Sequence, residues 1–348
     1  MAGRAKGGTT KPYYEQISER LIEQLEQGTA PFTKPWVPGE HVLPYNPTTG
    51  NEYKGSNSLW LQMQGRSDPR WLTYKQAQAV DAQVVKGERG TKIQYWKFPD
   101  KDDESADDQK RTRPSVFSAT VFNAEQIDGL AELQRESVQP AWQRHERAEA
   151  LLIASGASLA NDQADRAFYR LSTDSIHLPD KSSFAHADNY YSVALHELGH
   201  WTGHESRLSR DMSGGFGGPT YAKEELRAEI SSLMVGSELG VGHDIERHAS
   251  YVGSWIKVLK DDPKEILRAS RDADKIRGLV MSYDKELETE NQKANRLDPD
   301  DVMQKASEYA ERFTNDTDRQ RFLSGVRAKL PRTDEKVRTV EKDQAPEL

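Results

Sequence analysis

The chain has 348 residues, with 48 lysines and arginines against 56 aspartates and glutamates, a net charge of −8 and no cysteine. The absence of cysteine excludes disulfides and thiolate metal ligands, and it favours a cytoplasmic location. No apolar run approaches the length of a transmembrane helix, so no membrane partner is expected. Residues 1–10 are basic but lack the apolar segment of a secretory signal. The length predicts two domains.

The first part of the chain differs in charge from the rest. Residues 1–99 hold 13 lysines and arginines against 9 aspartates and glutamates, whereas the other 249 residues hold 35 against 47. The net charges are therefore +4 and −12. Such asymmetry indicates that the first part meets an anionic partner.

Short elements of both kinds are expected over residues 1–124. After a disordered arm at 1–10, residues 13–27 have the apolar spacing of an amphipathic helix that ends at Gly28. Pro and Gly then interrupt the pattern up to residue 98, and residues 46–50 form a turn between candidate strands. A helix is predicted near 74–85, and strands at 91–98 and 115–123 flank a charged loop at 100–113. This pattern predicts a compact α+β domain.

Aromatic and basic residues alternate in this domain, and four of the seven tryptophans lie within residues 32–98. Aromatic rings stack on unpaired bases and cations follow the phosphates, which is typical of a single-strand binder. The alternative is an ordinary aromatic core. The candidate DNA contacts are Trp36, Tyr45, Tyr53, Lys54, Trp60, Trp71, Lys75, Arg89 and Lys92.

The second half begins after a linker at 125–140 and is expected to be mostly helical over residues 141–332. A helix at 141–155 and a strand pair around 166–178 lead to the central motif, and further helices are predicted near 243–260, 263–290 and 299–315. Residues 333–348 have the composition of a disordered tail.

The pentapeptide at 196–200 reads His-Glu-Leu-Gly-His. On a helix, His196 and His200 project from one face and can hold a zinc ion. Glu197 beside them can take a proton from a water that the metal activates. Asp188 and Asn189 suit the start of this helix, and Gly203 suits its end. The alternative is a surface helix with two solvated histidines.

A catalytic zinc usually keeps three protein ligands. The metzincin pattern fails because Ser206 stands where its third histidine belongs, and His204 is expected to be an ordinary exposed residue. A helix over 221–234 offers Glu229 at the border of its apolar stripe, where a carboxylate is costly unless paired or bound to a metal. We predict Glu229 as third ligand and Glu225 as its supporting partner or substitute.

The predicted helix and the loop before it each leave an alternative open. Glu224 lies off the ligand face of the helix. The alternative to the metal assignment is that Glu225 and Glu229 form an i,i+4 pair on a solvated face. Residues 211–219 contain four glycines and form either a lid over substrate or a flexible connector.

Two separate patterns resemble one known family. Trp36, the turn 45–47, and the stretches 53–57, 71–77 and 87–91 resemble the N-terminal domain of ArdC-type antirestriction proteins, which also begins certain conjugative-plasmid primases. Residues 116–229, with the pentapeptide and the run around Glu225, resemble the zincin-like metallopeptidase domain fused to it. The resemblance covers residues 10–290 and implies a single-stranded DNA-binding domain followed by a gluzincin-like site, with His196, His200 and Glu229 on the metal and Glu197 as acid and base.

The resemblance implies an antirestriction protein that binds single-stranded DNA during conjugative transfer and travels with it to the recipient cell. Its cofactor is one divalent metal, zinc in the first place and manganese as the alternative. A protein substrate or a restriction enzyme is a further expected partner. Two other readings stay open: a DNA-binding protein whose metal site is structural or inactive, and a conventional cytoplasmic zinc endopeptidase. On the first of these, antirestriction does not require peptidase activity.

Overall fold

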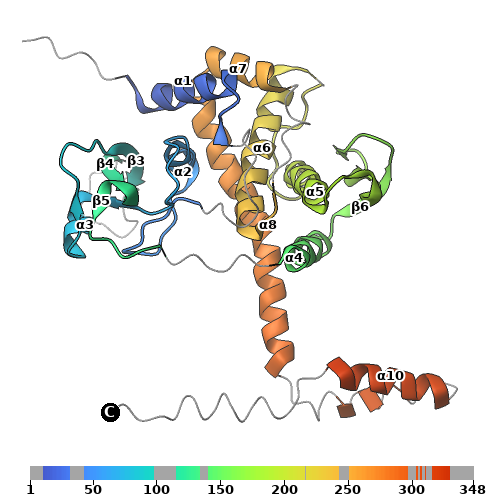
Figure 1. Cartoon of the computed structure of the whole chain (residues 1–348). Helices are drawn as coiled ribbons and strands as arrows, with labels where there is room; N and C mark the ends of the chain where they lie inside the picture. Colours follow the sequence, from blue (N-terminus) through green and yellow to red (C-terminus); the bar gives the residue numbers. More distant parts are fainter. Residues whose placement is uncertain are drawn as a thin grey trace, which may run out of the picture. The chain divides into compact units, whose positions relative to one another are not determined.

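The computed structural model describes residues 11–31, 43–97, 115–133, 140–215, 217–242, 251–296 and 316–329, with a few positions between 303 and 310. The chain divides into two compact units, Met1–Asp284 and Lys285–Leu348. Helices and small sheets occur together in the first unit (Figure 1), so the predicted α+β class is confirmed. The second unit contains the end of α8 and the helix α10 (Asp316–Lys329).

The N-terminal elements build a three-stranded sheet in the order β1-β4-β3 and a two-stranded sheet of β2 and β5, with all pairs antiparallel. The elements are α1 (Tyr13–Glu26), α2 (Gly55–Gln62), β1 (Trp71–Thr73), α3 (Tyr74–Ala79), β2 (Gln83–Val84), β3 (Thr91–Lys97), β4 (Ser115–Asn123) and β5 (Ile127–Asp128).

Most of these elements agree with the sequence patterns. The helix predicted at 13–27 and the strand predicted at 115–123 are confirmed by α1 and β4. The helix predicted at 74–85 is too long, because Asp81 has a φ of 57° and Val84 pairs with Ile127 in a sheet. β5 therefore lies inside the segment that was expected to be a linker, and α2 was not predicted.

The metal-site half contains a second three-stranded sheet in the order β6-β8-β7, in which β6 runs parallel and β7 antiparallel to β8. Strand β6 was not predicted, and the predicted helix at 299–315 lies largely outside the described residues. The elements are α4 (Ala141–Ala154), β6 (Ser158–Gln163), β7 (Phe168–Arg170), β8 (Ser175–Pro179), α5 (Ala187–Trp201), α6 (Pro219–Leu239), α7 (Val252–Asp261) and α8 (Glu265–Arg296).

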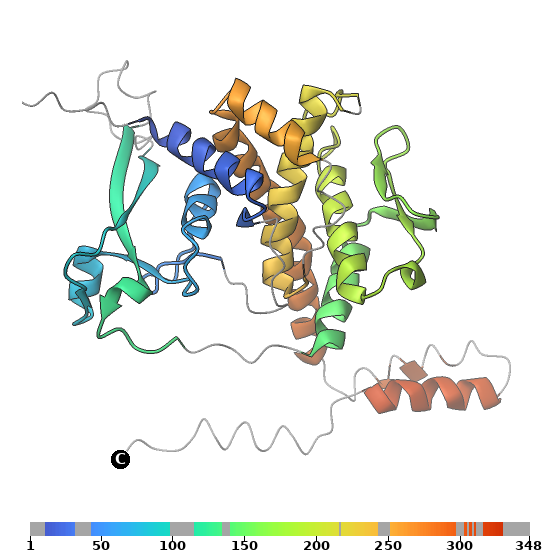
Figure 2. The ribbon, with the colours of Figure 1, turned by 45° about the horizontal axis from the view of Figure 1, so that its top comes forward.

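Helix α6 takes part in two hydrophobic cores. Its apolar stripe, which includes Leu226, Ile230 and Leu233, is buried in one cluster with residues of α1, α2, α7 and α8. Its C-terminal end joins a second cluster around α4, β8 and α5. Figure 2 shows α1 and α7 side by side next to α6. The first helix of the chain therefore shares a core with the helix that was predicted to supply a metal ligand.

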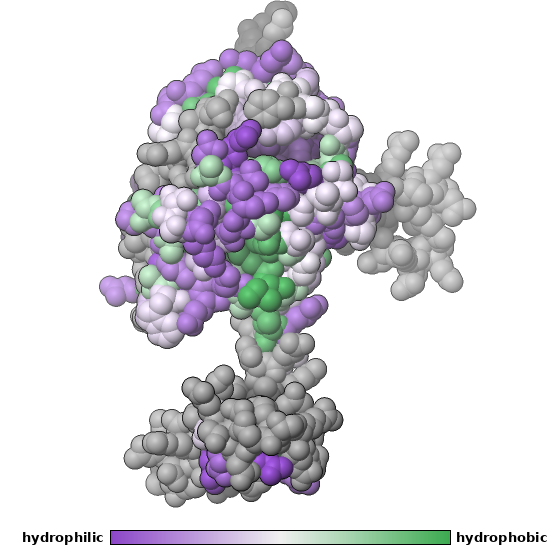
Figure 3. Space-filling model, turned by 90° about the vertical axis from the view of Figure 1, so that its right-hand side faces the viewer, coloured by the Kyte–Doolittle hydropathy of each residue, from purple (hydrophilic) through white to green (hydrophobic). Residues whose placement is uncertain are grey.

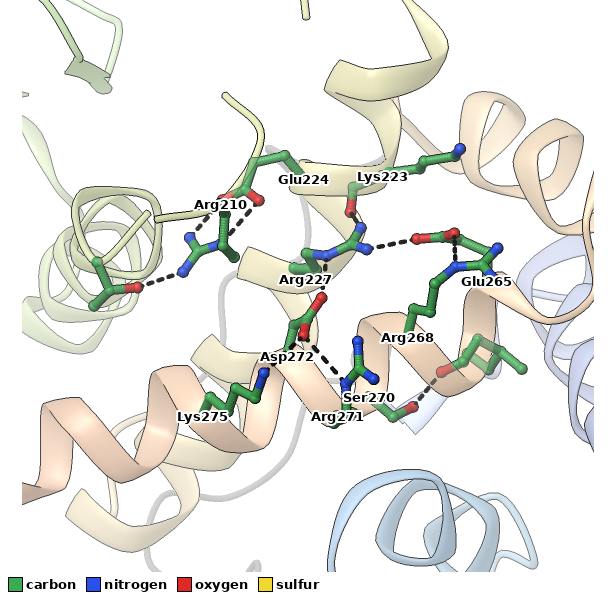
Figure 4. A network of polar contacts seen from close by, with 12 residues as sticks. Arg210, Lys223, Glu224, Arg227, Glu265, Arg268, Ser270, Arg271, Asp272 and Lys275 are labelled. Carbon is green, nitrogen blue, oxygen red and sulfur yellow. Dashed lines mark hydrogen bonds and ion pairs between the residues drawn. The ribbon is translucent and has the colours of Figure 1, made fainter. Parts of the chain in front are cut away.

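A buried ion network also fixes α6 to α8 (Figure 4). The Arg227 guanidinium lies 2.7 Å from Glu265 and 2.9 Å from Asp272, and it donates to the Lys223 carbonyl at 2.7 Å. Glu265 is 1% exposed, so its carboxylate depends on Arg227 and Arg268 for its charge partners. This network sets the position of α6 from the side opposite α5.

The surface matches the hydrophilic composition. None of the described helices combines the length and the apolar character that a membrane span requires. The face in Figure 3 is mostly hydrophilic around one narrow hydrophobic strip. Such a strip is common on folded proteins.

Candidate metal centre

Helix α5 presents the two histidines of the pentapeptide toward α6. Every residue from Tyr190 to Trp201 is buried, so the motif does not lie on a solvated surface helix. The imidazole rings of His196 and His200 are 4.8 Å apart at 80°, and their Nε2 atoms face each other at 3.2 Å. The one-turn spacing thus brings two nitrogen donors to one point.

Helix α6 brings a carboxylate to the same point. Glu225 lies 3.4 Å from Nε2 of His196 and 3.4 Å from Nε2 of His200. Donor atoms of these three buried residues all lie within 4.8 Å of one another, which makes them a candidate set of metal ligands among the described residues.

The outer nitrogens of both histidines face further carboxylates. His196 Nδ1 lies 3.3 Å from Glu229, and His200 Nδ1 lies 3.3 Å from Glu224. A carboxylate at Nδ1 fixes the tautomer that leaves Nε2 free to bind an ion. The site therefore has one carboxylate at the Nε2 atoms and two that orient the rings.

Arg210 holds Glu224 in place (Figure 4). Its guanidinium bonds the Glu224 carboxylate at 2.6 and 3.0 Å, the Gly199 carbonyl at 2.8 Å and the Thr202 hydroxyl at 2.7 Å. A Cβ on Gly203 would lie 2.9 Å from this guanidinium and 2.6 Å from Met212. Side chains of the segment after α5 thus pack closely over the end of this helix.

The charged groups of the site shift one another's pKa values. Burial by itself would lower the pKa of His200, but Glu225 and Glu224 outweigh it and raise the pKa to about 9. Burial likewise opposes protonation of His196, yet Glu225 and Glu229 hold its pKa well above the ordinary value. Burial would raise the pKa of Glu225, but the two histidines lower it. The two imidazoles therefore carry positive charge and Glu225 carries negative charge, and these charges stabilise one another.

Glu197 occupies a different environment. It is 7% exposed, and burial raises the pKa of its carboxyl above the ordinary value. The backbone N–H of Tyr169 in β7 donates to it. A carboxylate with a raised pKa beside a metal site is suited to proton transfer near neutral pH.

A cavity of ≈ 700 Å³ opens over these groups. Two tyrosines line it, and the Tyr221 hydroxyl lies 3.1 Å from the Tyr251 hydroxyl. Tyr221 also bonds Glu225, one helical turn away on α6. The other lining residues are Asp165, Arg166, Ala167, Phe168, Tyr169, Leu171, Val193, His196, Glu197, His200, Asp211, Met212, Gly214, Thr220, Glu224 and Glu225.

The structure brings together the predicted residues His196, Glu197, His200, Glu225 and Glu229, but with a different geometry for the glutamates. Glu229 was expected at the metal and lies at the outer nitrogen of His196, whereas Glu225 reaches both Nε2 atoms. Both lie on one face of α6, one turn apart, so their order depends on how α6 packs on α5.

The sequence patterns missed several residues of the site. Glu224 was placed off the ligand face, yet it is 6% exposed and bonds His200. Nothing in the patterns indicated Arg210, Tyr221 or Tyr251. His204 bonds the Ser206 hydroxyl at 2.8 Å and does not line the cavity, in agreement with the metzincin mismatch.

The candidate DNA contacts fall into three groups. Trp71 is 2% exposed in a hydrophobic core, so its ring has no face left for a base, and the expectation of a DNA contact there does not fit. Tyr45, Tyr53 and Trp60 are half-buried, and the last two donate to the backbone of Trp71 and Lys92. Lys54, Lys75, Arg89 and Lys92 are exposed, and Trp36 lies outside the described residues.

Two family matches cover most of this architecture. Residues 11–122 match the N-terminal domain of anti-restriction factor ArdC, and residues 146–272 match a family of zincin-like metallopeptidases. The second range contains both histidines, Glu197 and the three glutamates of α6.

Two similar proteins align with most of this chain. The DNA primase TraC of Escherichia coli is 55% identical over 307 residues, which is 83% of this chain but 29% of the primase. The chain therefore spans less than a third of that relative. The protein y4eC of Sinorhizobium fredii (strain NBRC 101917 / NGR234) is 36% identical over 77% of this chain and 91% of its own length.

Crystal structures of the antirestriction protein ArdC from plasmid R388 have a similar fold. The metal-free form has a TM-score of 0.67 at 32% identity and covers 79% of this chain and 99% of that one. The Mn(II)-bound form has a TM-score of 0.65 at 31% identity, over 79% and 98%. The family resemblance predicted from the sequence is thus confirmed, and the chain belongs to the ArdC antirestriction family, with a zincin-like metallopeptidase domain after the ArdC N-terminal domain.

Proposed function

We propose that this protein binds single-stranded DNA during conjugative transfer and carries a metal-dependent peptidase site, and that it protects the transferred DNA from restriction in the recipient cell. The observation that carries the peptidase part is the convergence of His196, His200 and Glu225 beside the buried Glu197. The DNA-binding part rests on the ArdC N-terminal domain and on its exposed cations.

The donor spacing fits a divalent cation. A four-coordinate zinc ion keeps nitrogen and oxygen ligands about 2.0–2.1 Å away, which separates neighbouring ligands by roughly 3.3–3.4 Å. Here the two Nε2 atoms are 3.2 Å apart, and each lies 3.4 Å from a different oxygen of the Glu225 carboxylate, so the donors surround a space of about this size. We assign Glu225 as third ligand and Glu229 as the residue that orients His196, with Glu224 in that role for His200. Two imidazoles and a carboxylate accept zinc or manganese.

The site can hydrolyse a peptide with its own residues in distinct roles. A cation held there would polarise the carbonyl group and acidify a bound water. Glu197 takes the proton of the attacking water on its carboxylate and returns it to the leaving amine. Strand β7 lies at the edge of its sheet beside the cavity, where its backbone can align an extended peptide.

Substitutions can distinguish the roles of Glu225 and Glu229 on α6. Glu225→Gln removes the anionic ligand and should abolish stoichiometric metal binding. Glu229→Gln removes only the support of His196 and should weaken metal affinity by roughly 10–100-fold. Competition with a chelator, followed by metal analysis, measures both, and the exposed Glu205→Gln serves as the matched control. Stoichiometric metal in Glu225→Gln together with none in Glu229→Gln would contradict the assignment.

The general base can be tested without disturbing the metal. Glu197→Gln keeps the shape of the side chain but cannot accept a proton, so hydrolysis of a quenched-fluorescent peptide mixture should fall by about 10²–10⁴-fold. Metal content should stay at the wild-type level, as in Glu205→Gln. Undiminished hydrolysis would rule out this role. Protection from restriction that persists in Glu197→Gln would separate antirestriction from proteolysis.

DNA binding should depend on salt and on the exposed cations of the N-terminal domain. Each cation that neutralises a phosphate of a single strand contributes about 0.7 to the slope of log affinity against log salt. The triple variant of Lys75, Arg89 and Lys92 to alanine should therefore reduce that slope by roughly 2. Anisotropy titrations of a labelled oligo-dT provide the measurement, and Lys257→Ala on α7 is the control. Wild-type protein that does not bind the oligonucleotide at low salt would contradict this part of the proposal.

A further inference from the structure

The antiparallel ribbon of β3 and β4 carries two aromatic rings on one face. Tyr95 and Phe117 are directly opposite each other in the register of the two strands. Their ring centroids are 5.6 Å apart and the rings are stacked at 18°. Tyr95 is 49% exposed and Phe117 is 42% exposed. A pair of parallel rings this open to solvent is unusual, because a core would normally enclose it.

The exposure has a structural cause. Ile93, two residues before Tyr95 on the same face, is buried in a core with Leu61 of α2 and Trp71 of β1. Helix α2 covers the ribbon up to this point, where Asn57 bonds the backbone of Gln94 on both its N–H and its carbonyl. The ribbon continues beyond α2, so the next aromatic pair on that face is left uncovered.

Four other aromatic residues that the structure describes in this domain are buried or bonded through their polar atoms. Trp71 is enclosed, Trp60 donates its indole N–H to the Lys92 carbonyl, and Tyr53 donates its hydroxyl to the Trp71 carbonyl. The exposed Tyr74 accepts at its hydroxyl from Gln83. Among the described residues of the domain, Tyr95 and Phe117 thus form the stacked pair whose ring faces remain accessible.

The surroundings favour an anionic occupant. Lys92 is exposed three residues before Tyr95 on the same strand, where its side chain projects from the opposite face of the ribbon. Residues 1–99, which include Tyr95, carry a net charge of +4. The part of the chain that bears the ring pair therefore has an excess of cations.

We infer that Tyr95 and Phe117 form a base-stacking surface for single-stranded DNA. The inference rests on the proposed DNA binding and gives that binding a place in the fold. Proteins that hold unpaired bases without reading their sequence combine accessible aromatic rings with an excess of cations. Neither ring was among the contacts predicted from the sequence, which favoured the tryptophans.

The test compares Tyr95→Ala and Phe117→Ala with Val116→Ala in the full-length protein. Val116 precedes Phe117 on β4 and is 46% exposed, but it has no ring. Loss of one stacking ring should weaken binding of a labelled oligo-dT by about 5–150-fold. Tyr95→Phe, which keeps the ring, should bind like wild type, and so should Val116→Ala. Urea denaturation checks that the alanine variants are folded, as expected for exposed positions.

Two further readouts separate stacking from a general loss of affinity. The slope of log affinity against log salt should be unchanged in Tyr95→Ala, because a phenol neutralises no phosphate. An abasic deoxyribose-phosphate strand of equal length should bind wild type and Tyr95→Ala alike. Equal oligo-dT affinity for wild type and both alanine variants would overturn the stacking surface alone. No binding by wild type would overturn the proposed DNA binding with it.

Discussion

The arrangement of this protein depends on the two faces of helix α6. One face directs Glu224, Glu225 and Glu229 toward the histidines of α5, and the opposite face is buried against α1, α2, α7 and α8. The metal-site residues and the first helix of the chain are therefore packed on the same element. A polypeptide cut between the two family matches would expose the apolar stripe of α6 on one side and the core residues of α1 on the other. Experiments on either activity are best made on the full chain.

The carboxylates on the metal-site face create a strong charge imbalance unless cations balance them. Glu197, Glu224, Glu225 and Glu229 are all less than 10% exposed. Arg210 offsets one negative charge, and protonated histidines offset more of it when no metal is bound. A divalent cation can replace those histidine protons with little change in net charge. The same buried groups can thus be stable in both states, provided that metal binding is coupled to proton release.

The sequence predicted the parts of the site that local helix geometry determines. His196, Glu197 and His200 follow from spacing within one helix, and α1 and β4 follow from local patterns. The order of the glutamates does not, because it depends on the distance between two helices. A Cβ on Gly199 would lie 3.1 Å from the Ser231 hydroxyl and 3.6 Å from the Ala228 Cα. This close approach lets adjacent residues such as Glu224 and Glu225 both reach the histidines, although they point 100° apart on a helix.

Local patterns were also insufficient to predict which aromatic residues of the first domain are exposed. Composition alone predicted that rings and cations gather there, but burial depends on where α2 ends over the ribbon. Trp71 belongs to the core, whereas Tyr95 and Phe117 lie beyond α2 and stay exposed.

Arg210 of the metal site could not be predicted either, because it reaches the site only through the return of the segment after Gly203.

The most direct test of the central claim is the number of protons released when the metal binds. Isothermal titration of zinc or manganese into the metal-free protein, in buffers of different ionisation enthalpy, gives this number. The pKa of His200 is raised to about 9, so at pH 7 its imidazole is protonated and must lose that proton to bind an ion. We expect release of at least one proton per ion at pH 7, an affinity that rises with pH, and a release that declines as the pH rises through about 9, where His200 loses its proton. Metal binding with no proton release at pH 7 would contradict the account.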